Sequence, residues 1–300
     1  MSPEAPRRFT TVQTLRFIVT LSVVAAMILS VLASLLEQPK ENARVLDRSE
    51  QMLIAAHVMN HEGYFVLPND KGMLERAMLT DQLTLKVDPQ AQEPGRNEVL
   101  SLYRKRFEPY FVNDKGEKKS AKDLGIDVND YVAKYKKEGY YTQPWKLLYE
   151  ILPNQPEQKD PVGYVIPING FGLWDAIYGY LAINPDGNTV IGTTWYEQKE
   201  TPGLGANIAD AAWQSQFPGK VIFQPSTDGE TDFKRAPIGI TVVKGKVSEV
   251  IGDKPKARNA VDGMSGATLT GNGVTDAYKD VLEAYRPFLV KLHDGGKGNG

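Results

Sequence analysis

The chain has 300 residues, of which 41% are hydrophobic and 24% charged, and its formal net charge is −2. This balance argues against a nucleic-acid partner, because a surface that binds a phosphate backbone needs a marked excess of basic residues. The absence of cysteine excludes disulfides, thiolate metal sites and cysteine nucleophiles. His57 and His61 have a spacing that suits a metal ion, but no third ligand is evident, so we predict no metal site.

The first element is an apolar run over residues 17–36. These twenty residues carry no charge, and their length suits a helix that crosses a hydrocarbon core. A cleaved signal peptide is the alternative, but the run is too long and no small-residue cleavage site follows it. Arg7, Arg8 and Arg16 precede the run, which predicts a cytoplasmic tail over residues 1–16 and places the remaining chain outside.

Two segments follow the apolar run. Residues 37–60 carry apolar residues among charges at helical spacing, and we expect a helix that leaves the membrane and leads into the outer domain. Residues 61–160 are charged, with scattered aromatic residues and turn signals, and a helical pattern covers residues 127–140. We expect this second segment to be a variable α/β insertion packed on the main domain.

Residues 161–300 are expected to form the main domain. Runs of apolar and β-branched residues predict strands at residues 163–168, 175–183, 189–197, 220–224 and 238–243. Residues 184–188, Asn-Pro-Asp-Gly-Asn, are typical of a hairpin turn. Antiparallel strands with helices gathered around them predict an α+β domain with a mainly antiparallel sheet.

The last element is an amphipathic helix that we expect to begin at Val274. The residues just before it, 261–273, are mostly small or carry hydroxyl groups. A helix N-terminus offers free N–H groups and the positive end of the helix dipole, which together favour a phosphate. Capping and turn formation are the simpler interpretation of such residues, and the composition alone favours it over anion binding.

The order of the residues in this stretch is more informative about function than their composition. Asp262, Ser265, Gly266, Ala267 and Thr268 stand in the pattern D-x-x-S-G-A-T, which resembles the flavinylation motif D-x-x-[S/T]-G-A-T. Residues 172–174, 196–205 and 269–274 are similar to the C subunit of Na⁺-translocating NADH:quinone reductases, as are the N-terminal anchor and the helix expected after it. The resemblance covers both ends and the C-terminal half of the chain, and it is weakest over residues 61–160.

The resemblance implies a cofactor and its site. In that family the last threonine of the motif carries flavin mononucleotide (FMN) through a phosphoester bond, which implies one covalent FMN per chain at Thr268. Implied flavin contacts are Ser265, Gly266, Ala267, Leu269, Thr270, Thr201, Gly203, Leu204, Leu173 and Trp174. An ordinary hairpin loop at residues 201–205 and a core tryptophan at residue 174 are the alternatives. Asp262 is expected to serve recognition by the flavin transferase, or else to stabilise a turn. No catalytic side chain is required, because the cofactor carries the redox chemistry.

The implied function is electron transfer within an enzyme complex, the Na⁺-transporting NADH:ubiquinone reductase. Such a subunit relays electrons from NADH towards quinone while the complex exports Na⁺. Its expected partners are the other subunits, the flavin transferase during maturation and the lipid of the bacterial inner membrane, with the C-terminal domain in the periplasm. The G subunit of the Rnf electron-transport complex, which shares the flavin domain and a single anchor, is one alternative. A membrane-anchored binding or scaffold protein without a cofactor is another.

Overall fold

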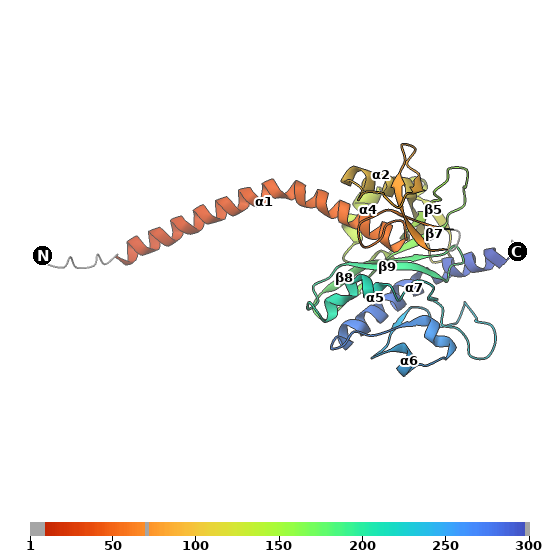
Figure 1. The fold of residues 1–300 in the computed structure, drawn as a ribbon. Coiled ribbons are helices and arrows are strands. Elements are labelled where there is room, and N and C mark those ends of the chain that lie inside the picture. Colours follow the sequence, from red (N-terminus) through yellow and green to blue (C-terminus); the bar gives the residue numbers. More distant parts are fainter. Residues whose placement is uncertain (1–9, 70–71, 298–300) are drawn as a thin grey trace. The chain divides into compact units, whose positions relative to one another are not determined.

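The computed structural model describes residues 10–69 and 72–297, and the chain divides into two compact units, residues 1–47 and 48–300. Helix α1 (Thr11–Ala55) supplies the described part of the first unit and ends in the second (Figure 1). Its apolar part has a mean hydropathy of 2.5 and none of it is buried, so by length and composition α1 is a candidate membrane span. Of the arginines that precede the apolar run, Arg7 and Arg8 lie outside the described residues.

Helix α1 is continuous where two helices were expected, over residues 17–36 and 37–60. It contains Pro39 and ends at Ala55. His57 follows in a left-handed conformation, with φ of 56°. His57 and His61 therefore do not share a helix face, and no group of three or more His, Cys, Asp or Glu in the described part of the chain could hold a metal ion.

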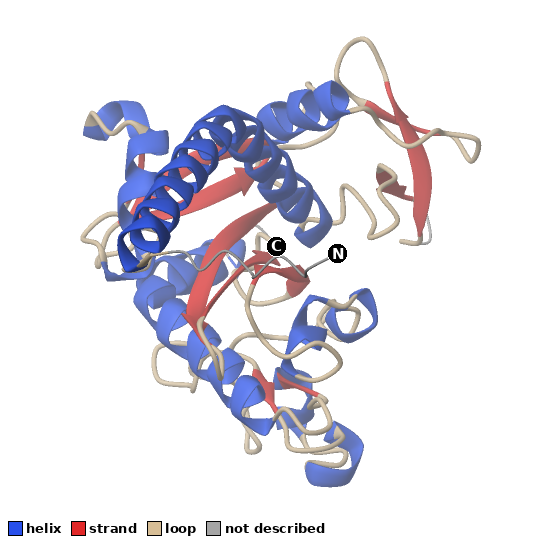
Figure 2. Cartoon of the chain, turned by 90° about the vertical axis from the view of Figure 1, so that its left-hand side faces the viewer, coloured by secondary structure: helices blue, strands red, loops and turns tan. Residues whose placement is uncertain are grey.

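The second unit is built on a six-stranded antiparallel sheet in the order β5-β4-β6-β7-β8-β9. Its strands are β4 (Phe107–Val112), β5 (Lys118–Ser120), β6 (Lys146–Ile151), β7 (Gly163–Phe171), β8 (Ala176–Ile183) and β9 (Val190–Glu197). Figure 2 shows these strands with helices around them. The predicted α+β class with a mainly antiparallel sheet is confirmed.

The hairpin between β8 and β9 forms at the predicted turn. Asn184 N–H donates to the Thr189 carbonyl at 2.7 Å, and the Asp186 carboxylate accepts from the N–H groups of Asn188 and Thr189. Gly187 has φ of +67°, and a Cβ there would lie 2.6 Å from the Leu289 carbonyl oxygen. Glycine thus serves both the turn and the close approach of the last helix.

Residues 61–160 contribute half of the central sheet, namely β4, β5 and β6. This differs from the expectation of an insertion packed on a separate main domain, because the sheet continues across residue 160. The segment also forms a small sheet, β1 (Val66–Pro68), β2 (Leu74–Leu79) and β3 (Leu85–Val87), and the helices α2 (Arg96–Arg106), α3 (Ala121–Leu124) and α4 (Val128–Tyr135). Helix α4 covers only the first part of the helix expected over residues 127–140.

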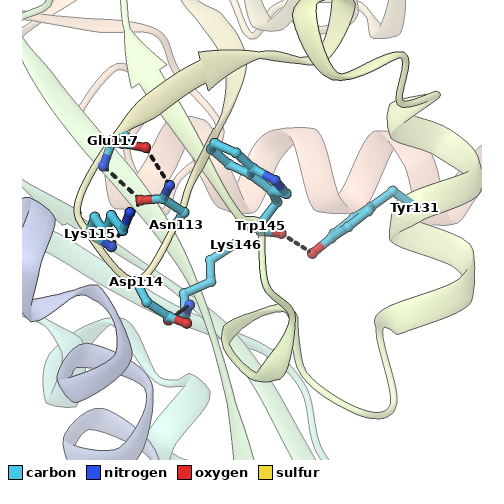
Figure 3. A network of polar contacts seen from close by, with 7 residues as sticks. All are labelled: Asn113, Asp114, Lys115, Glu117, Tyr131, Trp145 and Lys146. Atoms are coloured by element: carbon cyan, nitrogen blue, oxygen red, sulfur yellow. Dashed lines mark hydrogen bonds and ion pairs between the residues drawn. The ribbon is translucent and has the colours of Figure 1, made fainter.

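Polar contacts within this segment hold the β4–β5 turn and α4 against β6 and the residue before it (Figure 3). The β4–β5 turn is held by the Asn113 side chain, which accepts from Lys115 N–H and Glu117 N–H at 2.9 and 3.0 Å. Lys146, buried on β6, pairs with Asp114 of this turn, and Tyr131 of α4 donates to the Trp145 carbonyl at 2.6 Å.

Both faces of the central sheet are covered, as Figure 1 shows for β8 and β9. On one face, apolar residues of β7 and β8 pack against the last helix, α7 (Thr268–Lys297), in the main hydrophobic core. On the other face, the end of α1 lies against β9, because Thr194 donates to the Gln51 carbonyl at 3.1 Å. Burial on both faces explains why every residue of β6 is buried, including two charged ones.

Two predicted strands, over residues 220–224 and 238–243, are largely absent. Only single bridges form there, together with a parallel pair of two-residue strands, β10 (Thr241–Val242) and β11 (Ala260–Val261). The buried Asn259 amide donates to the carbonyls of Val221, Ile222 and Gly239, so that a side chain satisfies acceptors that a strand ladder would otherwise use. Short helices complete the chain: η1 (Tyr140–Thr142), η2 (Gly205–Ala209), α5 (Ala211–Gln214), α6 (Val247–Val250) and η3 (Pro255–Asn259).

Helix α7 begins at Thr268, six residues before the predicted start at Val274. Gly271 and Gly273 in its first turns led to the prediction of a loop, but in the structure they allow the helix to pack closely on its neighbours. A Cβ at Gly273 would lie 2.0 Å from the Phe171 carbonyl oxygen, and one at Gly271 would lie 3.1 Å from Val242. The backbone of the first turns of α7 therefore packs directly against the backbone at the end of β7. The low helix propensity of glycine favours a loop and gives no sign of this packing.

Candidate functional site

The D-x-x-S-G-A-T stretch forms a tight turn between β11 and α7. Ala267 N–H donates to the Met264 carbonyl at 3.2 Å, and Gly266, the third residue of this turn, has φ of +73°. This conformation favours glycine. A Cβ at Gly266 would lie 2.9 Å from the Leu204 side chain, so glycine also allows a second loop to approach the turn.

Thr268 is the first residue of α7 and is exposed. The Ala267 carbonyl accepts the first helical hydrogen bond, from Gly271 N–H at 2.9 Å, which makes alanine the N-cap. Alanine has no side-chain acceptor, and within the described ranges no acceptor meets the N–H groups of Thr268, Leu269 or Thr270. The helix therefore presents free donors beside an exposed hydroxyl, which suits a phosphate group.

The hydroxyl side chains of Ser265, Thr268 and Thr270 differ in their surroundings. Ser265 and Thr268 are exposed, whereas Thr270 is only 1% exposed. The Thr270 hydroxyl donates to the Glu200 carboxylate at 2.5 Å. The structure thus places Thr270 in a supporting contact, and it leaves Ser265 and Thr268 accessible to a modifying enzyme.

Glu200 joins three segments that are far apart in the sequence. The residue is 5% exposed, and its carboxylate accepts from Leu173 N–H at 3.1 Å, from Trp174 N–H at 3.0 Å and from the Thr270 hydroxyl. Burial acts to raise the pKa of Glu200, but the hydrogen bonds from Thr270 and the two backbone N–H groups outweigh it, and the pKa lies below its usual value. The sequence did not predict Glu200 as a site residue, although it lies within residues 196–205, whose letters support the resemblance.

The two loops joined by Glu200 present an exposed apolar surface. Trp174 is 67% exposed, so it is not a core tryptophan, and its Nε1–H donates to the Thr201 hydroxyl at 3.1 Å. Gly203 has φ of +74° in the turn that closes with a bond from Leu204 N–H to the Thr201 carbonyl. The other exposed apolar side chains of these segments and of the first turn of α7 are Phe171, Leu173, Leu204 and Leu269.

A cavity of about 460 Å³ lies on another side of Thr268. Its walls are the turn over residues 262–268, the first turn of α7, residues 242–246 and Glu249. The charged residues on it are the exposed Lys244, Lys246 and Glu249 together with Asp262. None of the predicted contacts in the loops at residues 173–174 and 201–204 lines it. Apart from Thr270, which is buried and does not line the cavity, the predicted flavin contacts thus fall into two groups, one on this cavity and one on the exposed apolar surface.

Asp262 shapes the wall of the cavity. Its carboxylate accepts from Val247 N–H, at the start of α6, at 2.7 Å. Its backbone is held as well, because Asp262 N–H donates to the Gln216 side chain and the Trp213 indole donates to the Asp262 carbonyl. These contacts agree with the turn-stabilising alternative for Asp262, and its role in recognition by a transferase stays a prediction.

Comparison with known proteins identifies the family. Residues 172–283 match the FMN-binding domain family. The C subunit of the Na(+)-translocating NADH-quinone reductase from Chlamydia caviae is 40% identical over an alignment 301 positions long, gaps included, which covers 94% of each chain. The protein of the same name from Chlamydia pneumoniae is 38% identical over an alignment 289 positions long, which covers 92% of this chain and 90% of that one. This chain belongs to the family of NADH-quinone reductase C subunits.

A solved structure supports the fold of this family member. The crystal structure of the C subunit of the Na(+)-translocating NADH-quinone reductase from Parabacteroides distasonis aligns with a TM-score of 0.53 at 24% identity. The alignment covers 85% of this chain and 96% of that one. The predicted resemblance is therefore confirmed, and the match to an FMN-binding domain favours a flavoprotein over the alternative of a scaffold without a cofactor.

Proposed function

We propose that this chain is the electron-transfer subunit of a Na⁺-translocating NADH-quinone reductase, with FMN attached to Thr268 by a phosphoester bond. One observation carries the proposal. The acceptor hydroxyl predicted by the motif is exposed on the first residue of α7, beside helix N–H groups that have no acceptor in the part of the chain described. An accessible hydroxyl suits attachment by a separate enzyme, and the free N–H groups suit the phosphate that remains.

The residues around Thr268 fit the parts of FMN. The phosphate would accept hydrogen bonds from the N–H groups of the first turn of α7, with Lys244 and Lys246 on the rim of the adjoining cavity to balance its charge. Leu173, Trp174 and Leu204 offer apolar surface to the ring, and Ser265, Gly266, Ala267, Leu269 and Thr201 complete its surroundings. Bound FMN supplies the electron-transfer chemistry, and this chain's part is to hold it and to exclude water around it.

Glu200 has a positioning role in this proposal. By holding the 173–174 loop against Thr270, its carboxylate fixes the apolar loops relative to the start of α7. The three hydrogen bonds do not involve Thr268, so they leave its hydroxyl free. The flavin is then held between segments that are already fixed before it is attached, which reduces the ordering cost of binding.

The names of the relatives supply the remaining parts of the proposal. Electrons would pass through this FMN on their way from NADH towards quinone, and the complex would couple the transfer to Na⁺ export. We place residues 17–36 of α1 across the bacterial inner membrane, with the N-terminus in the cytoplasm and the C-terminal domain in the periplasm. The partners would be the other subunits, membrane lipid and, during maturation, a flavin transferase that recognises Asp262 and the turn after it.

Peptide mass spectrometry of the full chain, made in membranes together with its flavin transferase, tests the attachment. We expect FMN on the fragment that contains Thr268, and no covalent FMN after Thr268→Ala. Ser265→Ala is the matched control, because it removes the other exposed hydroxyl of the same turn and should keep the flavin. Stoichiometric FMN on Thr268→Ala would refute the assignment. Identification of the proteins that co-purify with the chain distinguishes a quinone reductase from an Rnf complex.

A further inference from the structure

A second cavity lies at the other end of the central sheet from Thr268. It has a volume of about 570 Å³ and adjoins Val162, next to the first residue of β7, whereas the last residue of β7, Phe171, meets the first turns of α7. β7 has 9 residues, which at about 3.3 Å per residue spans roughly 30 Å. The cavity is therefore separate from the candidate flavin site, and the proposed function does not use it.

The walls of this cavity are mainly aliphatic. The small sheet contributes Val66 and Leu74, and the central sheet contributes Ile151 and Ile191. The polar side chains that line it are Arg106, His57 and Asn184, and no carboxylate of the described residues lies among them. Burial, together with the nearby His61, lowers the pKa of His57, so at neutral pH the imidazole adds no charge. Arg106 is thus the charged group of the cavity.

Arg106 is a buried cation that has no counterion among the described residues, 10–69 and 72–297. It is 6% exposed, its Nε–H donates to the Leu152 carbonyl at 2.7 Å, and its Nη1 has no hydrogen-bond partner in the part of the chain described. No carboxylate in those residues forms an ion pair with it. Burial lowers the pKa of Arg106 to about 10, so the guanidinium stays charged at neutral pH. An uncompensated buried charge is costly, which favours an anionic occupant.

We propose that this cavity binds a medium-chain aliphatic carboxylate, with its carboxylate paired to Arg106 and its chain packed against the aliphatic walls. A planar guanidinium matches a carboxylate in charge and geometry. The volume lies within the range of small-molecule sites, which are mostly apolar with a few polar groups that fix orientation. An inorganic anion would leave the aliphatic walls uncovered, and an organic cation would be repelled. The occupant is a free fatty acid of medium chain length.

Isothermal titration of the full chain in dodecyl maltoside tests the proposal, with octanoate as the ligand and micelles without protein as the blank. We expect saturable binding of one octanoate per chain, and at least tenfold weaker binding of octanamide, which has the same chain without the charge. Arg106→Met should reduce octanoate affinity at least tenfold, because it keeps the side-chain volume and removes the cation. Arg104→Met, which changes an exposed arginine of the same helix, is the matched control and should bind as the wild type does.

A second variant keeps the test decisive if Arg106→Met does not fold. Val162 lies at the cavity and is 40% exposed, so Val162→Glu should fold and should weaken octanoate binding by placing a competing carboxylate there. The readout is independent of FMN, because neither variant lies near Thr268. Failure of the wild type to bind octanoate would overturn the proposal. Equal affinity for octanoate and octanamide would do the same, as would unchanged octanoate binding in both variants.

Discussion

Replacement of Glu200 by glutamine should loosen the candidate flavin site and destabilise the domain. The Glu200 carboxylate accepts three hydrogen bonds, from Leu173 N–H, Trp174 N–H and the Thr270 hydroxyl. A glutamine keeps one acceptor oxygen, and its NH₂ group faces a donor. At least one part-buried backbone N–H then loses its partner, which costs about 1 kcal/mol, the lower end of the range for a buried donor. The two remaining bonds lose the strengthening that a charged acceptor gives, about 1 kcal/mol each.

The expected loss in the free energy of unfolding is therefore about 3 kcal/mol for Glu200→Gln. With a urea m value of about 3 kcal/mol/M, this moves the unfolding midpoint down by about 1 M. Urea titration of the full chain, followed by tryptophan fluorescence, measures the shift. Glu230→Gln, which neutralises an exposed carboxylate, is the control and should change the stability by less than about 0.5 kcal/mol. If the urea midpoint of Glu200→Gln shifted no more than that of this control, the three hydrogen bonds to the Glu200 carboxylate would be refuted.

The pH dependence gives a second measurement of the same contact. The pKa of Glu200 is lowered in the folded protein, so its contribution to stability is fully present above the usual glutamate pKa of 4.5. The contribution is lost as pH falls through the lowered value in the folded state. We therefore expect the destabilisation by Glu200→Gln to be largest near pH 7 and to shrink below about pH 4.5. A difference in stability that stays constant from pH 7 to pH 3 would contradict this.

Three further predictions concern other parts of the molecule. Leu204→Asp should leave FMN attached but change its absorption spectrum or its potential, because a charge would face the ring; an unchanged spectrum and potential in a folded variant would place this loop away from the flavin. Asn259→Ala should lower the free energy of unfolding by about 2–4 kcal/mol in urea titrations, since it removes the side-chain donor from the carbonyls of Val221 and Gly239, whereas the Ile222 carbonyl keeps its bond from Gly239 N–H; a loss under about 0.5 kcal/mol would show that these carbonyls need no such donor. Protease added to intact spheroplasts should digest the domain after α1, and full protection until lysis would reverse the proposed orientation.

Local patterns in the sequence were sufficient for several features. The charge-free run predicted the apolar part of α1, and residues 184–188 predicted the β8–β9 hairpin, because turn geometry depends on neighbouring residues. Alternating and helical patterns predicted the α+β class. The residues around Thr268 predicted the family, since that resemblance rests on a short contiguous segment that can be read from the sequence alone.

Contacts between distant residues were decided by the tertiary structure. Glu200 and Thr270 are 70 positions apart, and only the packing of α7 on the end of β7 brings them together. The start of α7 at Thr268 was missed because the glycines that hid it are needed for that packing. The strands β4 to β6 were placed outside the main domain because partner choice in an antiparallel sheet has no local signal. In the sequence Arg106 is an ordinary arginine of a charged segment, and only the fold buries it with no counterion among the described residues. Local preferences act over a few residues, whereas burial and pairing depend on which distant segments meet.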